Sequence, residues 1–354
     1  MSGSPIDIVV FAPLAPLFGV LLFWFIQLLF IESHKYQLSK IWEKHKPLCR
    51  FTNFLGILYQ TVCHALGFTV TKSGISNFYI SVDYGKVAPK KEKKGIFEWT
   101  SNAFLFVGPF FIPALLLFIV FFLIQNGSIE IAQSMEYTFA EGMINFGTNL
   151  YAFSEHLFLL LISIDLLHPP HIIFLILLIF LGMGIRPSYV GEEKRKKVNM
   201  LYDLYNIKVH IFQKPLYILL LFLIAYIFFY ISVLLKTNWY TSLFSIFGWL
   251  SIIAIVSLII AHMIIFLIKA LDEISGLLKI LPFFTLLLSY ALMRLSLPSI
   301  IQNEYIASVS LFVMLFSTGA VILLLLKFTT NKFKPSMKMK ELRVEDGPKR
   351  NIRK

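Results

Sequence analysis

The sequence predicts a polytopic α-helical membrane protein, and three observations support this prediction. Hydrophobic residues make up 57% of the 354 residues and charged residues only 15%, with a mean hydropathy of +0.76. A soluble domain of this length cannot bury so much apolar surface. Apolar runs of about 20 residues, the length that crosses a bilayer as a helix, recur along the chain. Basic residues gather between these runs, as they do in cytoplasmic loops.

The first apolar run, residues 8–31, predicts a transmembrane helix whose N-terminal end lies outside, because residues 32–50 after it are rich in Lys and Arg. No basic leader precedes this run and no small-residue cleavage site follows it, so we interpret it as a retained helix. The next run, 51–70, is followed by a second basic segment, 71–98. Two strongly basic segments belong on one side of the membrane, so 51–70 is predicted to dip into the bilayer and return as a re-entrant helix.

Strand-forming residues follow a helix break at Gly67 and predict a small β-hairpin. Residues 68–71 are expected to form its first strand and residues 78–84 its second. The Lys-Ser-Gly sequence at 72–74 supplies the turn chemistry expected between them.

Six further spans are expected, which with the first gives about seven crossings: 101–125, 151–186, 216–235, 243–267, 281–297 and 305–326. Gly108-Pro109 and Pro113 should kink the first of these, and Pro169-Pro170 should split the second into 153–167 and 171–185. The connections predict an outside segment at 126–150 with an interfacial helix at 132–146, and a cytoplasmic loop at 191–215 with a helix at 196–205. The basic tail from 327 is expected to be cytoplasmic and mostly disordered.

These expectations divide the chain into five parts. Residues 1–50 form the first transmembrane helix with its basic loop, 51–188 a membrane core with the re-entrant helix and hairpin, and 189–215 a cytoplasmic loop. Residues 216–327 form a C-terminal four-helix membrane region, and 328–354 the tail.

The sequence Gln60-Thr61-Val62-Cys63-His64, followed by Ala-Leu-Gly, resembles the zinc-binding helix of site-2-type (M50-like) intramembrane metalloproteases. That helix carries HExxH, in which two His bind zinc and the Glu activates a water. A β-hairpin follows it in the family, and the resemblance extends over about 40% of the chain, to the segment Ile185-Arg186-Pro187-Ser188. The family motif places Gln60 at the first His, Thr61 at the Glu and His64 at the second His.

Two of these three positions depart from the family in a way that bears on chemistry. A neutral Gln60 is a poor zinc ligand, and Thr61 cannot act as the general base that Glu provides. His64 alone does not make a zinc site. The resemblance therefore implies a peptidase-like fold without hydrolytic activity, and we expect no catalytic residue, no bound metal and no cofactor. A membrane helix whose polar residues bond to its neighbours remains the simpler alternative.

Ionisable residues inside apolar segments are a second set of candidates, because charge within a bilayer is costly. This set comprises Glu155, His156, Asp165, His168 and His171. Asp165 and His168 are three residues apart, hence expected on one helix face. A hydrogen-bonded structural pair, a proton relay and a metal site shared with His64 all fit this spacing.

Later spans contain isolated polar residues, namely His262, Arg294 and Glu304. We expect His262 to hydrogen-bond a neighbouring helix and Arg294 to extend toward the outer surface. The two cysteines, Cys49 and Cys63, are interpreted as free thiols.

Two basic runs explain much of the net charge of +12: Lys90, Lys91, Lys93 and Lys94, and Lys194, Arg195, Lys196 and Lys197. In a membrane protein such runs set orientation or contact anionic lipid or a partner. We therefore expect no nucleic-acid partner.

The resemblance favours a non-catalytic, multipass protein of the cell (plasma) membrane, with the N-terminus outside and the C-terminus cytoplasmic. Such a protein would bind other membrane proteins or their transmembrane segments as an assembly factor, subunit or regulator. The alternative is a transporter or channel component that uses Asp165, His168 and His262 along a polar path. An active peptidase with altered ligands is a third option.

Overall fold

The computed structural model describes residues 4–125, 138–185, 208–209, 214–300 and 302–345. Contacts divide the chain into two compact units, unit 1 (Met1–Leu160 and His168–Met263) and unit 2 (Leu161–Leu167 and Ile264–Lys354). The elements, in chain order, are η1 (Asp7–Phe11), α1 (Leu14–Ile41), α2 (Lys46–Val70), β1 (Ile75–Ile80), β2 (Gly85–Pro89), α3 (Ile96–Phe106), α4 (Gly108–Ile124), α5 (Phe139–Ile162), α6 (Pro169–Gly184), α8 (Pro215–Leu234), α9 (Trp239–Glu273), η2 (Gly276–Ile280), α10 (Leu281–Ser296), η3 (Leu297–Ser299) and α11 (Asn303–Glu345).

Among these described elements, five helices are long and apolar enough to cross a membrane. They are α1, α8, α9, the η2–α10–η3 segment and α11, and the bent pair α3–α4 makes a sixth if it is one span. This confirms a multipass helical protein with membrane-length helices. The remaining predicted span, 151–186, is divided between α5 and α6, and α6 is a shorter apolar helix of 16 residues.

Proline positions set two of the helix boundaries, as the sequence predicts. The helices α3 and α4 meet at Gly108-Pro109 with a bend of 64°. Pro169-Pro170 opens α6, and the residue before it, His168, is extended (φ −99°, ψ 112°) because a following proline disfavours the helical conformation.

Two boundary predictions are wrong. The helix expected at 132–146 begins at Phe139 and continues to Ile162 as α5, because Phe146, Leu150, Phe153 and Leu157 form one continuous buried face. The tail expected to be disordered instead continues helix α11 to Glu345. The helix expected at 196–205 lies outside the described residues.

The hairpin exists, but its strands lie further along the chain than predicted. The helix α2 runs through residues 68–70, so the Lys-Ser-Gly sequence ends the helix and does not turn the hairpin. The antiparallel pair is β1 with β2, with Phe78 opposite Val87 and Tyr79 opposite Lys86. The turn between the strands is residues 81–84, where Ser81 Oγ accepts hydrogen bonds from the amides of Asp83 and Tyr84. Continuous helix packing outweighed the strand preference of residues 68–71.

The core of unit 1 is aromatic and joins α4, α5, α6 and α9. The Trp249 ring stacks on Phe153 with centroids 5.3 Å apart, and Phe121 contacts both Phe153 and Phe174. Trp249 Nε1 donates to the carbonyl of Asn149 at 3.0 Å. Where α6 meets α9, a Cβ on Gly182 would overlap the Ser257 carbonyl, so a small residue permits this close approach.

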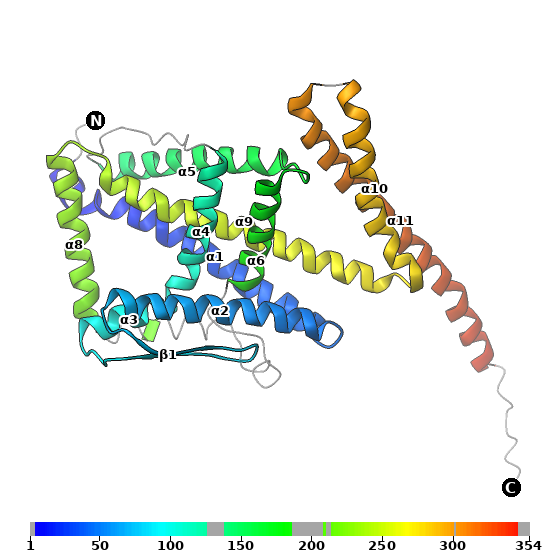
Figure 1. Ribbon diagram of the computed structural model, residues 1–354, viewed down its shortest axis with the longest axis horizontal. Helices are drawn as coiled ribbons and strands as arrows, with labels where there is room; N and C mark the ends of the chain where they lie inside the picture. The colour runs from blue at the N-terminus through cyan, green and yellow to red at the C-terminus, as the bar shows by residue number, and fades with distance from the viewer. Residues whose placement is uncertain (1–3, 126–137, 186–207, 210–213, 301, 346–354) are drawn as a thin grey trace, which may run out of the picture. The chain divides into compact units, whose positions relative to one another are not determined.

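Figure 1 shows how these helices place the two ends of unit 1. The helices α2 and α3 lie with the hairpin at one end, and α5 lies at the opposite end. The helices α4, α6 and α8 run between the two ends, whereas α2 runs crosswise to them. In unit 2, α10 packs against α11.

Candidate functional site

Thr61, the residue that the sequence resemblance placed at the general base, is covered by the hairpin. The residue is 5% exposed, and its Oγ1 donates to the carbonyl of Ile57 at 2.6 Å. Gly85, the first residue of β2, lies directly over it, so that a Cβ at Gly85 would overlap Thr61 Oγ1 and come within 3.0 Å of Ile57 Cγ2. The hydroxyl is therefore engaged by its own helix and covered by backbone.

His64, which the sequence resemblance placed at the second histidine, lies about one turn further along α2. Its ring contacts that of Phe68 at 4.3 Å between centroids. Its Nε2 atom is buried and has no hydrogen-bond partner in the part of the chain that the structure describes. The hydroxyl of Ser101, on the facing helix α3, is likewise buried without a partner there. Gly67 permits this approach, since a Cβ on it would lie 2.9 Å from the Ser101 carbonyl oxygen.

Two further glycines bring other helices against the same stretch of α2. A Cβ on Gly108 of α4 would lie 2.9 Å from Cys63 Cβ, and Cys63 is a fully buried free thiol, as is the buried Cys49. A Cβ on Gly184 of α6 would lie 2.7 Å from the Leu55 side chain. The hairpin, α3, α4 and α6 thus pack around α2 between Leu55 and Gly67, on several of its faces.

This enclosure limits what the motif can do chemically. Gln60 is partly buried, and its side-chain amide is neutral. Among the described residues, no group of three or more His, Cys, Asp or Glu side chains lies close enough to hold a metal ion. The arrangement holds a buried polar helix among its neighbours, and the described residues offer no cluster of ligands that would include His64.

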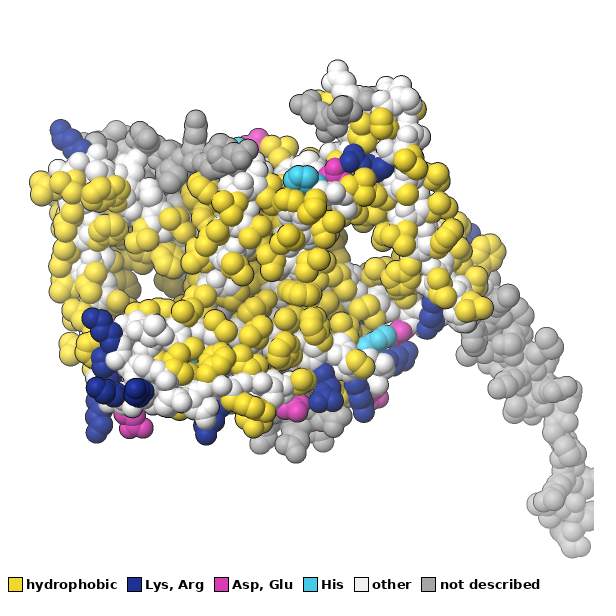
Figure 2. Space-filling model, viewed as in Figure 1, with side chains coloured by type: hydrophobic (Ala, Val, Ile, Leu, Met, Phe, Trp, Pro, Cys, Tyr) yellow, Lys and Arg dark blue, Asp and Glu magenta, His cyan; other side chains and the backbone are white. Residues whose placement is uncertain are grey.

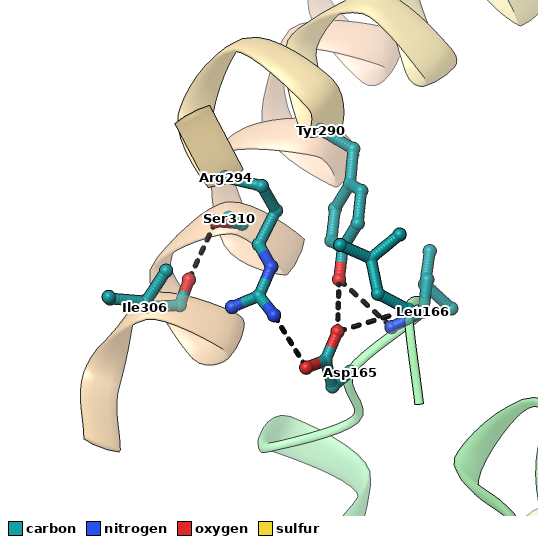
Figure 3. A network of polar contacts seen from close by, with 7 residues as sticks. Asp165, Leu166, Tyr290, Arg294, Ile306 and Ser310 are labelled. Carbon is teal, nitrogen blue, oxygen red and sulfur yellow. Dashed lines mark hydrogen bonds and ion pairs between the residues drawn. The ribbon is translucent and has the colours of Figure 1, made fainter. Parts of the chain in front are cut away.

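Asp165 takes part in a polar network that lies wholly within unit 2. Its Oδ2 accepts from the Arg294 guanidinium at 2.6 Å, and its Oδ1 accepts from the Tyr290 hydroxyl at 3.0 Å and the Leu167 amide at 2.9 Å. The Tyr290 hydroxyl also accepts from the Leu166 amide at 2.9 Å. Figure 3 shows Tyr290 and Arg294 reaching from one helix, α10, toward the same carboxylate.

The expected pairing of Asp165 with His168 on one helix face is wrong, because α5 ends at Ile162 and Asp165 lies in a non-helical segment. The Leu167 amide bonds to the Asp165 side chain, which is the turn that aspartate often forms with the residue two positions later. His168 instead contacts His171 edge to face at 4.7 Å. Arg294, expected to extend toward the outer surface, binds Asp165.

His262 joins α9 to α1, which confirms the expected helix–helix hydrogen bond. One ring nitrogen, Nε2, lies 3.0 Å from Ser33 Oγ, and the other, Nδ1, lies 2.7 Å from the Leu258 carbonyl. The His34 ring lies 5.3 Å away, centroid to centroid. Glu155 is exposed and His156 partly buried on α5; the side chain of Glu304 lies outside the described residues, as do Lys194, Arg195, Lys196 and Lys197.

The basic run after the hairpin contains three exposed lysines and one lysine that is held by contacts. Lys90, Lys91 and Lys94 are exposed. Lys93 is partly buried, because its Nζ donates to the Thr71 carbonyl at 2.6 Å and lies 4.8 Å from the Phe97 ring. A cation at this carbonyl complements the negative end of the α2 dipole.

Sequence reasoning missed a set of tyrosines that hold the N-terminal segment. The hydroxyl groups of Tyr230, Tyr226 and Tyr240 donate to the carbonyls of Val9, Val10 and Pro13, respectively. Pro13 has no N–H, so the Val9 carbonyl loses its ordinary helical donor and Tyr230 replaces it. The one sequence signal was Pro13, because a proline near a helix start implies an orphaned carbonyl four residues earlier.

The fold and these contacts define the protein as a multipass helical membrane protein. No family model, no curated protein and no solved structure matches the chain.

Proposed function

We propose that this protein is a non-catalytic, M50-like membrane protein that binds other membrane proteins as an assembly factor, subunit or regulator. The observation that carries the proposal is the state of Thr61. A peptidase needs a carboxylate at this position to activate water, and here a hydroxyl bonds to the Ile57 carbonyl beneath Gly85.

Three further features support a peptidase-like arrangement that has lost its chemistry. The hairpin follows α2 directly and packs on it, in the order that the resemblance implies. The C-terminal end of α6 packs on α2 through Gly184. The helix α2 runs crosswise to α4, α6 and α8, which favours a re-entrant or surface-lying segment over a crossing one (Figure 1).

The exposed faces of α8 and α10 are the surfaces we assign to partner helices. Only 11% of the most apolar stretch of each is buried within the chain. Leu219 on α8 is 67% exposed, and Leu287 on α10 is 69% exposed. Within a bilayer these faces contact lipid or the transmembrane segments of another protein. We place the protein in the plasma membrane with its N-terminus outside, by the distribution of basic residues.

The first test is for zinc and peptidase activity in the purified full chain. The proposal expects less than stoichiometric zinc by elemental analysis and no cleavage of a reconstituted transmembrane substrate. The proposal would be wrong if the protein bound stoichiometric zinc and cleaved the substrate. If the Thr61→Ala variant cleaved equally well, the hydrolysis would use residues other than Thr61.

The second test places a photo-crosslinking amino acid at Leu219 or Leu287 in native membranes. We expect one discrete membrane-protein adduct, identified by mass spectrometry, from at least one of these positions. Phe266 of α9, which is 75% exposed, is the matched control. Lipid adducts alone at Leu219 and Leu287, or the same adducts from Phe266, would refute binding at the assigned faces.

The transporter alternative has one specific observation in its favour, the His34–His262 pair beside Ser33 in two membrane-length helices. It requires that His262→Gln reduce flux in liposomes while the protein stays folded. Asp165 gives weaker support to a transport path, because the Arg294 guanidinium neutralises its carboxylate.

A further inference from the structure

The end of α2 holds a lysine in an unusual backbone conformation. The amide of Ser73 donates to the Phe68 carbonyl at 2.9 Å, and the amide of Lys72 donates to the Thr69 carbonyl at 3.0 Å. These two bonds form a Schellman cap, in which the residue after the cap is left-handed and is usually glycine. Here that residue is Lys72, with φ of 54°. A lysine therefore occupies a left-handed position at which glycine would be less strained.

Backbone pairing brings further lysines to the same place. The amide of Lys90 donates to the Gly74 carbonyl at 3.1 Å, and the amide of Lys91 donates to the Ser73 carbonyl at 3.0 Å. The start of β1 and the residues after β2 are thus joined beside the helix end. Lys72, Lys90 and Lys91 are all exposed there. Like charges held together by the backbone repel one another unless an anion lies between them.

The contacts of α3 with α8 place this group at the level of the membrane boundary. Lys214 directly precedes α8, a span of 20 residues, and its Nζ lies 4.0 Å from Glu98 of α3. Trp99 contacts Tyr217 with ring centroids 5.8 Å apart. Trp and Tyr gather at the depth of lipid headgroups. The short segment from Lys91 to Glu98 therefore keeps the lysines near that depth.

We name this group the basic corner; it comprises Lys72, Lys90, Lys91, Lys94 and Lys214. Figure 2 shows Lys and Arg side chains gathered at this end of unit 1, with a large group at the corner where α3 and α8 lie. Among the residues that the structure describes, the acidic side chains near it are Glu92, which is exposed, and Glu98, which is engaged with Lys214. The five lysines outnumber these two carboxylates, so the described side chains of the corner carry net positive charge.

We propose that the basic corner binds the headgroups of anionic phospholipids. The phosphate is the anion that this depth supplies, and lysine ammonium groups are suited to it as point charges. Phe97 is exposed beside Lys93, so an apolar surface for an acyl chain adjoins the lysines. The surface thereby binds specific lipids at the foot of α3 and α8, separately from any protein partner.

The experiment measures thermal unfolding of the detergent-purified full chain with added phosphatidylglycerol or phosphatidylcholine. A ligand that binds only the folded state raises the unfolding midpoint, and we expect a rise of about 5 °C for phosphatidylglycerol over phosphatidylcholine. The variant Lys72→Gln/Lys90→Gln/Lys91→Gln should lose at least half of this rise. Native mass spectrometry, which counts retained lipids, should show the same loss whatever the stability of the variant.

The matched control removes the same charge elsewhere, with Lys40→Gln/Lys208→Gln/Lys279→Gln, and should keep the full rise. Lys72→Gly should raise the midpoint without lipid, because strain is relieved, and reduce the rise with phosphatidylglycerol. An equal loss in both triple variants would overturn the proposal. So would an equal response to both lipids, or lysine-dependent binding of polyglutamate without binding of phosphatidylglycerol, which would assign the corner to an acidic polypeptide.

Discussion

Replacing Arg294 by leucine removes the cation from the Asp165 network and leaves the carboxylate partly buried. The two side chains are 21% and 23% exposed, so the interaction is screened less than a surface pair but more than a fully buried one. Removing one partner of a buried pair costs about 3–5 kcal/mol, and a hydrogen bond to a charged group contributes about 1.5–3 kcal/mol. With partial exposure, and with the bonds from Tyr290 and Leu167 retained, we expect a loss of about 2–3 kcal/mol.

The assay is reversible unfolding by sodium dodecyl sulfate in mixed micelles, which yields a free energy of unfolding for each variant. Tyr290→Phe should cost about 1.5–3 kcal/mol, because it removes the hydroxyl that donates to the charged Asp165 carboxylate and accepts from the Leu166 amide. Asp165→Leu/Arg294→Leu should lose less than Arg294→Leu alone, since no charge is left unpaired. Lys279→Leu removes a cation from the same unit and should change the free energy by less than about 0.5 kcal/mol. If Arg294→Leu is as stable as the original chain, the network does not stabilise unit 2 and the reasoning is refuted.

Three other substitutions test the packing. Thr61→Glu should lower the free energy of unfolding by about 3 kcal/mol or prevent folding, because a carboxylate would be buried beneath Gly85; wild-type stability would show that the hairpin does not cover Thr61. Gly182→Ala should cost about 1–3 kcal/mol in the same assay, because the new methyl group overlaps the Ser257 carbonyl; an unchanged value would contradict the close approach of α6 and α9. Tyr240→Phe should cost about 1 kcal/mol, and a gain in stability would argue against its hydrogen bond to the N-terminal segment.

Part of the fold was predictable from sequence, because some residues constrain the backbone at their own position. Pro109 and Pro169 constrain the backbone directly, so the bend of α3–α4 and the start of α6 followed from them. The apolar length of α8 likewise fixed its bounds to within one residue of the prediction. The strands were misplaced because Phe68, Val70 and Thr71 favour strand conformation by their local propensity. In the structure the end of α2 packs closely on α3 at Gly67, and this packing keeps residues 68–70 helical.

The candidate site was less predictable, since its contacts join residues far apart in the chain. Asp165 and Arg294 are separated by 129 positions, and no spacing rule links them. The spacing of Asp165 and His168 indicated one helix face only on the assumption of a continuous helix, which His168, extended before Pro169, interrupts. The covering of Thr61 by Gly85 depends on where the hairpin folds back, which a local pattern does not specify.

The three tyrosine hydroxyls that bond to Val9, Val10 and Pro13 also bear on how the protein is made. Their donors come 216 to 227 residues later in the chain. Residues 9–13 therefore gain these bonds only after α8 and the start of α9 have been synthesised, because a chain is translated from its N-terminal side. Until then the Val9 carbonyl, which Pro13 leaves without a helical donor, needs another partner such as water, and a chain truncated before Tyr226 would lack all three bonds to this segment.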